Sequence, residues 1–166
     1  MKLNDYRRPL HTLSEDTDNH KIVCNRRNRF VDFDQLKKVR KTKKLPYSPD
    51  MLFIHAKKKE VWFVEFKSSA KTSLEGKKKY ELKRKALDGL IIFYEVFKGF
   101  YDFKKYYFVV YDKSRSYEEE VVNALSEKDV EFGLEELEGK FYEKVFTDSC
   151  ETFVSEWNRR FGKIFM

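Results

Sequence analysis

Residues 49–67 read PDMLFIHAKKKEVWFVEFK, in which a Pro-Asp precedes two apolar runs separated by a short basic segment. The runs 51–56 and 61–66 are rich in β-branched and aromatic residues, which is typical of strands. The KKKE segment between them leaves room only for a hairpin connection. A turn centred on Lys57 and Lys58 places Asp50 opposite Glu65, whereas a turn shifted by one residue does not. In the first case the hairpin brings two acids side by side on one face of a sheet.

The second strand of this hairpin ends in charged residues. Period-two alternation assigns its side chains to two faces, with Val61, Phe63, Glu65 and Lys67 on one and Trp62, Val64 and Phe66 on the other. Both faces are apolar for most of their length, which is typical of a central strand covered on both sides. Glu65 and Lys67 are therefore either ordinary surface residues at a strand end or members of a functional site.

A helix and a parallel strand are expected after the hairpin. Apolar residues at helical spacing predict a helix over about 75–97, and YYFVVYD predicts a strand at 106–112. The order strand, helix, strand predicts a right-handed parallel crossover. Lys83 falls in the middle of the apolar stripe that Tyr80 and Leu87 mark. It either extends past the edge of the sheet to water or points into the same site as Lys67.

The other segments are less periodic. The remaining expected elements are strands at 21–25 and 29–33 and helices at 34–44, 118–128 and 150–162. Asp32 is expected to cap the first of these helices. Residues 1–166 contain no repeat and no Gly/Pro linker, so the chain is expected to form one domain. Its predicted class is α/β, a mixed central sheet with an antiparallel hairpin and a parallel crossover, flanked by helices.

Composition narrows the class of protein. Cys24 and Cys150 have no Cys or His partner at the spacing of a zinc site, so we expect two buried free thiols. The three histidines are scattered and support no catalytic triad. No run of about 18 apolar residues is present, and the N-terminus has no apolar stretch of signal-peptide length. The expectation is a soluble cytoplasmic protein without a membrane partner.

The formal net charge of +7 is unevenly distributed. Residues 1–85 contain 24 Lys and Arg against 11 Asp and Glu, whereas residues 86–166 contain 11 against 17. A segregated basic half indicates contact with a polyanion such as nucleic acid. The alternative is a solvated lysine-rich surface without a partner.

An acid that opens one strand and a Glu-x-Lys that ends its neighbour meet the needs of phosphodiester hydrolysis. Asp50 and Glu65 provide oxygen ligands of the kind that Mg²⁺ or Mn²⁺ prefers, and the metal also binds substrate phosphate. Lys67 follows Glu65 by two strand positions and so lies on the same face. Its ammonium group could orient the attacking water or stabilise the charge that develops at phosphorus.

Pro49-Asp50 followed by Glu65-Phe66-Lys67 resembles the motif of the PD-(D/E)XK, or restriction-endonuclease-like, superfamily of nucleases. The resemblance covers residues 45–112 and implies a core of helix, three-strand meander, helix and strand. It implies that Asp50 and Glu65 bind the metal and that Lys67 assists the water or the transition state. It also implies a further catalytic lysine on the next helix, where Lys83 is the candidate.

The chain departs from the family in its first third. Members usually carry another acid on their first helix, and here Glu15, Asp32 and Asp34 are the candidates for a third carboxylate. The number of metal ions, one or two, stays open with it.

The resemblance and the basic half together imply a metal-dependent endonuclease that acts on DNA. The basic residues expected to face nucleic acid are Lys77, Lys78, Lys79 and Arg84. An RNA-cleaving nuclease of the same fold is one alternative, since metal chemistry at phosphorus does not distinguish DNA from RNA. A non-catalytic module that binds nucleic acid or protein is the other. Many members of the family form homodimers, which is a further expectation here.

Overall fold

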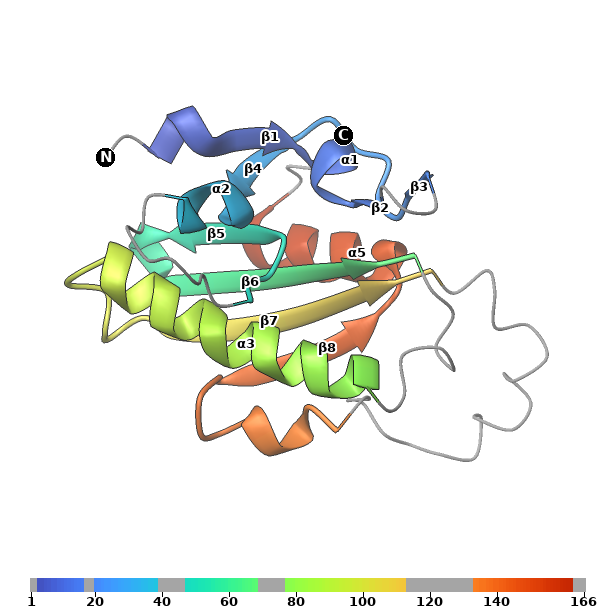
Figure 1. Ribbon diagram of the computed structural model, residues 1–166. Coiled ribbons are helices and arrows are strands. Elements are labelled where there is room, and N and C mark those ends of the chain that lie inside the picture. The colour runs from blue at the N-terminus through green and yellow to red at the C-terminus, as the bar shows by residue number, and fades with distance from the viewer. Residues whose placement is uncertain (1–2, 17–19, 39–46, 69–76, 113–132, 163–166) are drawn as a thin grey trace.

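The computed structural model describes residues 3–16, 20–38, 47–68, 77–112 and 133–162 (Figure 1). Its centre is a six-stranded sheet in the order β1-β4-β5-β6-β7-β8. The strands are β1 (Arg7–Pro9), β4 (Arg29–Asp32), β5 (Met51–His55), β6 (Glu60–Lys67), β7 (Lys104–Tyr111) and β8 (Lys144–Asp148). Neighbours from β1 to β6 are antiparallel, whereas β6, β7 and β8 are parallel. The predicted mixed α/β architecture is therefore confirmed.

Two long helices cover the sheet, α3 (Lys77–Val96) and α5 (Cys150–Phe161), and they lie on opposite faces (Figure 1). Shorter elements complete the fold: α1 (Leu10–Leu13), β2 (Glu15–Asp16), β3 (Lys21–Ile22), α2 (Phe33–Lys37), η1 (Leu3–Tyr6), η2 (Ala56–Lys58) and η5 (Glu135–Leu137). The helix α3 lies between β6 and the parallel strand β7 in the chain, which confirms the predicted order of strand, helix and parallel strand. Among the described helices, none is long and apolar enough to cross a lipid bilayer.

The β5–β6 hairpin has the expected register, with Met51 paired to Val64 and His55 to Glu60. Its turn closes because His55 Nδ1 accepts a hydrogen bond from the Lys58 backbone N–H at 3.1 Å. Extending the pairing by one position beyond Met51 sets the chain at residue 50 against β6 at residue 65, as the turn at Lys57 and Lys58 predicts.

The alternation along β6 separates two cores. Val61 and Phe63 pack with Leu82, Ala86 and Phe93 of α3 on one side of the sheet. On the other side, Trp62, Val64 and Phe66 pack with Phe153 and Trp157 of α5. All of these side chains are buried, so β6 is a central strand covered on both faces, as expected.

The buried face of α3 differs from the one that the sequence pattern favoured. Tyr80 was expected to face inward, yet it is 64% exposed. Leu82, Ala86 and Phe93 are buried instead. The buried face of α3 is therefore turned about the helix axis relative to the expectation. This rotation changes which lysine of α3 reaches the sheet.

The cysteines also differ from the expectation, because Cys24 and Cys150 form a disulfide across 126 residues of chain. Disulfides are rare in the cytoplasm, so this bond is not what the expected compartment favours. The free-thiol prediction was wrong because no spacing rule connects two cysteines so far apart in the chain.

Four further predicted segments can be compared with the structure. The helix expected over 34–44 corresponds to α2, which Asp32 caps as predicted by accepting from the Gln35 N–H at 3.0 Å, but which ends at Lys37. The strand expected at 21–25 is limited to β3, which pairs with β2 outside the main sheet. The helix expected at 118–128 lies outside the described residues. The helix expected at 150–162 is confirmed as α5.

Candidate active site

Asp50 is fixed at the start of β5 by two backbone contacts. Its carbonyl oxygen accepts a hydrogen bond from the Phe33 N–H at 3.1 Å. Its carboxylate Oδ2 accepts another from the Phe66 N–H at 2.7 Å, which connects it directly to β6. The hairpin register therefore orients the acid as well as placing it beside Glu65.

Glu65 lies inside the protein with its side chain fully buried. Two ammonium groups neutralise it, because both Lys67 Nζ at 2.7 Å and Lys85 Nζ at 2.6 Å contact its Oε1 atom. Lys85 Nζ also lies 3.9 Å from Asp50 Oδ1. One ammonium group thus contacts both carboxylates, and the two acids share a cation.

The electrostatics of the pair follow from this burial. Burial raises the pKa of the Asp50 carboxyl from 3.8 to about 7, the negative charge of Glu65 adds to the rise, and Lys85 opposes it. For Lys85, burial alone would lower the pKa, but the charges of Glu65 and Asp50 raise it above its ordinary value. The lysine is therefore held in its charged form.

A pH-dependent stability is expected from Asp50. Its pKa is higher in the folded protein than in the unfolded chain, so ionisation disfavours folding. In the absence of metal, stability should fall as pH rises from about 4 to about 7, by at most about 4 kcal/mol at about 1.4 kcal/mol per pH unit. Asp50→Asn should flatten this profile and be more stable than the wild type at pH 8. Urea midpoints at pH 5 and pH 8 in EDTA measure it, with the exposed Asp102→Asn as control. An equal loss in the wild type and in Asp50→Asn would contradict the assignment.

The second oxygen of Glu65 is the unusual atom of the site. Glu65 Oε2 is buried and has no hydrogen-bond partner. A buried charged oxygen without a partner is costly, and a metal ion or a water molecule would satisfy it. Asp50 Oδ1 and Glu65 Oε1 contact the same Lys85 ammonium group, so the two carboxylates lie in one place. Carboxylate oxygens are the donors that Mg²⁺ and Mn²⁺ prefer, and waters and phosphate oxygens would fill the other positions. The residues therefore fit such an ion, although the described residues contain no group of three or more metal-ligating side chains.

Of the three candidate third acids, Asp34 is the one whose charge acts on Lys85. Its charge contributes to the raised pKa of Lys85. Asp34 Oδ1 accepts a hydrogen bond from the Ser48 hydroxyl and lies 2.7 Å from Lys37 Nζ. Asp32 has a different role as the cap of α2, and Glu15 is exposed in β2.

Lys83 does not lie with Asp50 and Glu65 as predicted. Its Nζ atom is 2.7 Å from Glu136 Oε1, on the other side of α3. The rotation of the helix takes Lys85 to the site in its place. Lys85 was missed because Tyr80 and Leu87 were taken to mark the buried face of the helix. The face that is buried is the one that carries Leu82, Ala86 and Phe93.

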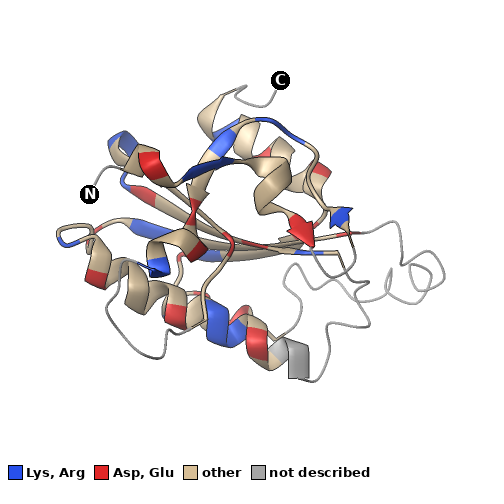
Figure 2. Ribbon diagram, turned by 45° about the horizontal axis from the view of Figure 1, so that its top comes forward, with Lys and Arg blue, Asp and Glu red and all other residues tan. Residues whose placement is uncertain are grey.

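The expected nucleic-acid contacts lie along the first turns of α3. Figure 2 shows the basic turn at residues 83–85 between acidic positions of the same helix. Arg84 is half-exposed, lies 3.5 Å from Asp88 and has its guanidinium 5.4 Å from the centre of the Tyr47 ring. Lys77, Lys78 and Lys79 belong to α3, but their side chains lie outside the described part of the structure.

Gly89 allows α3 to approach the Pro-Asp segment closely. A Cβ atom at this position would lie 2.7 Å from Cδ of Pro49, which is too short for a rigid ring to tolerate. Gly→Ala inside a helix normally stabilises by about 1 kcal/mol. Here we expect Gly89→Ala to destabilise by roughly 1–3 kcal/mol. Urea unfolding measures the change, and the same substitution should cost less in a Pro49→Ala background. Stabilisation by Gly89→Ala in the wild-type background would show that the two segments are not in contact.

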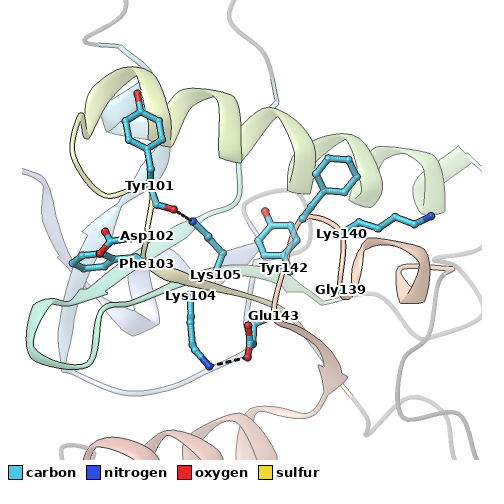
Figure 3. Close-up of a pocket in the computed structure, with 10 residues that line it drawn as sticks. Tyr101, Asp102, Phe103, Lys104, Lys105, Gly139, Lys140, Tyr142 and Glu143 are labelled. Atoms are coloured by element: carbon cyan, nitrogen blue, oxygen red, sulfur yellow. Dashed lines mark hydrogen bonds and ion pairs between the residues drawn. The ribbon is translucent and has the colours of Figure 1, made fainter.

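A separate cavity of about 520 Å³ lies at the start of β7 (Figure 3). The start of β7 pairs with the start of β6, whereas Glu65 lies near the other end of β6. Charged side chains that line this cavity form hydrogen bonds and ion pairs. Lys105 Nζ donates to the Tyr101 carbonyl at 2.6 Å, and Lys104 pairs with Glu143 at 2.9 Å. These groups do not converge on one point, so the Asp50–Glu65 pair remains the candidate active site.

The chain has no recognisable relative, since no protein-family model, no curated protein and no solved structure matches it.

Proposed function

We propose that this chain is a metal-dependent endonuclease with a restriction-endonuclease-like core, and that it hydrolyses phosphodiester bonds in DNA. The observation that carries the proposal is the arrangement of Asp50 and Glu65. The two acids share a cation at the end of a central strand, and one buried oxygen of Glu65 has no hydrogen-bond partner. A buried carboxylate oxygen without a partner is costly, and a divalent ion bound there would satisfy it.

In the proposed mechanism, Asp50 and Glu65 hold a divalent ion, Mg²⁺ or Mn²⁺. When bound, the ion lowers the pKa of a water molecule and neutralises charge on the scissile phosphate. Lys67 lies on the same face of β6 as Glu65, with its side chain about a quarter exposed. It is therefore placed to donate a hydrogen bond to a phosphate oxygen or to orient the attacking water.

DNA is favoured over RNA as the substrate because of the resemblance, while the basic half of the chain supports a polyanion in either case. The test is cleavage of single-stranded, double-stranded and branched DNA and of RNA, each with Mg²⁺, Mn²⁺ or EDTA. Metal-dependent DNA cleavage supports the proposal, and cleavage of RNA alone reassigns the substrate. Without cleavage of any substrate and without a rise in melting temperature in millimolar Mn²⁺, the chain would instead be a non-catalytic binding module.

A further inference from the structure

Lys85 occupies the place between the two carboxylates. Its side chain comes from α3, is only 20% exposed and reaches Glu65 Oε1 at 2.6 Å and Asp50 Oδ1 at 3.9 Å. An ion that both acids bind must lie in this same region. Lys67 reaches the same Glu65 oxygen from β6 instead.

The charge balance of the site sets a condition on metal entry. With both acids ionised, Lys67 and Lys85 neutralise them without any metal. A divalent ion added to that arrangement would place four positive charges against two negative ones in a largely buried space. Such an excess of buried charge is unfavourable, and removal of one ammonium group relieves it.

Resting on the metal site of the proposed function, we propose that Lys85 is the resident counter-ion of Asp50 and Glu65, and that a divalent metal binds by displacing it. The displaced ammonium group remains tethered to α3. The displaced ammonium group can pair with the carboxylate of Asp34, since the charge of Asp34 already acts on Lys85. Metal affinity is then set by a competition between the ion and a side chain of the protein itself.

Binding of Mn²⁺ to the purified full-length chain, measured by calorimetry, tests the displacement. Lys85→Met should bind Mn²⁺ more tightly than the wild type, by roughly tenfold or more. In this variant the ion no longer has to displace an ammonium group from the two carboxylates. Lys83→Met is the matched control. It removes the same charge two residues away on the same helix, where the lysine pairs with Glu136. Its affinity should stay within about twofold of the wild type, since Lys83 pairs with Glu136 and not with Asp50 or Glu65.

A second variant and a second measurement cover the case in which Lys85→Met folds poorly. Lys85→Arg keeps the charge and adds a bidentate contact to carboxylates, so it should bind Mn²⁺ more weakly than the wild type. In the wild type, Mg²⁺ should shift the side-chain ¹³Cε and ¹⁵Nζ resonances of Lys85 and leave those of Lys83 unchanged.

The outcomes separate the two proposals. Tight binding by the wild type, with Lys85→Met equal or weaker and no resonance shift, would overturn the displacement and leave the metal site standing. Binding by Lys85→Met alone would support displacement, with Lys85 as the dominant competitor. No binding by any variant would overturn the metal site, and the displacement with it.

Discussion

Glu65→Gln and Lys67→Ala are each expected to reduce metal-dependent DNA cleavage by at least about a hundredfold, the usual effect of removing one group that stabilises a transition state. Glu65→Gln keeps the shape of the side chain but removes the charge that holds the ion. Lys67→Ala removes the proposed donor to the phosphate and leaves Glu65 in contact with Lys85 at 2.6 Å. Initial rates on a labelled duplex in Mg²⁺ measure both effects.

The two variants should separate metal binding from chemistry. Glu65→Gln should lose the rise in melting temperature that Mn²⁺ produces, whereas Lys67→Ala should keep it. Affinity for DNA in EDTA should be nearly unchanged in both, because we expect the basic residues of the first half to supply most of it. Lys83→Ala serves as the control with wild-type cleavage, since Lys83 pairs with Glu136 away from the site. Wild-type rates in both Glu65→Gln and Lys67→Ala would refute the assignment of the active site.

The part of the site contributed by the hairpin could be predicted from the sequence because it depends on local rules. The short KKKE connection limits the hairpin to a few registers, and for each register alternation gives the face of every residue that follows. The observed pairing of Met51 with Val64 agrees with this prediction. The position of Asp50 relative to Glu65 is therefore encoded within about twenty consecutive residues.

The contribution of α3 could not be predicted in the same way. A helix with apolar residues on much of its circumference has more than one plausible buried face, and packing against the sheet decides between them. In α3 the choice falls on Leu82, Ala86 and Phe93, while Tyr80 is left exposed. Lys83 and Lys85 lie about 200° apart around the helix, so this choice of face brings Lys85 to the site and not Lys83. Asp34 was one of three candidates for the same reason, because its distance from Lys85 depends on how α2 packs.

Removal of the Cys24–Cys150 disulfide is expected to have the largest effect on stability. The bond closes 126 residues of chain and connects the segment before β4 to the first residue of α5. Cys24 is fully buried, and its backbone N–H and carbonyl both contact the Ser14 hydroxyl, at 3.0 and 3.2 Å. Without the bond the unfolded chain gains conformational freedom, which costs roughly 4–5 kcal/mol of stability for a loop of this length.

Cys24→Ser with Cys150→Ser should therefore lower the melting temperature by roughly 10 °C or more, at about 2–4 °C per kcal/mol for a chain of this size. Dithiothreitol should lower the melting temperature of the wild type by a similar amount and leave the double variant unchanged. That last comparison separates the cross-link from the packing of the sulfur atoms, because serine alters packing in the variant while dithiothreitol alters only the bond. Because Cys24 is fully buried, thiol titration after denaturation in urea without reductant provides the direct check. Two reactive thiols in protein purified under non-reducing conditions would show that the bond does not form, and the expectation of buried free cysteines would then stand.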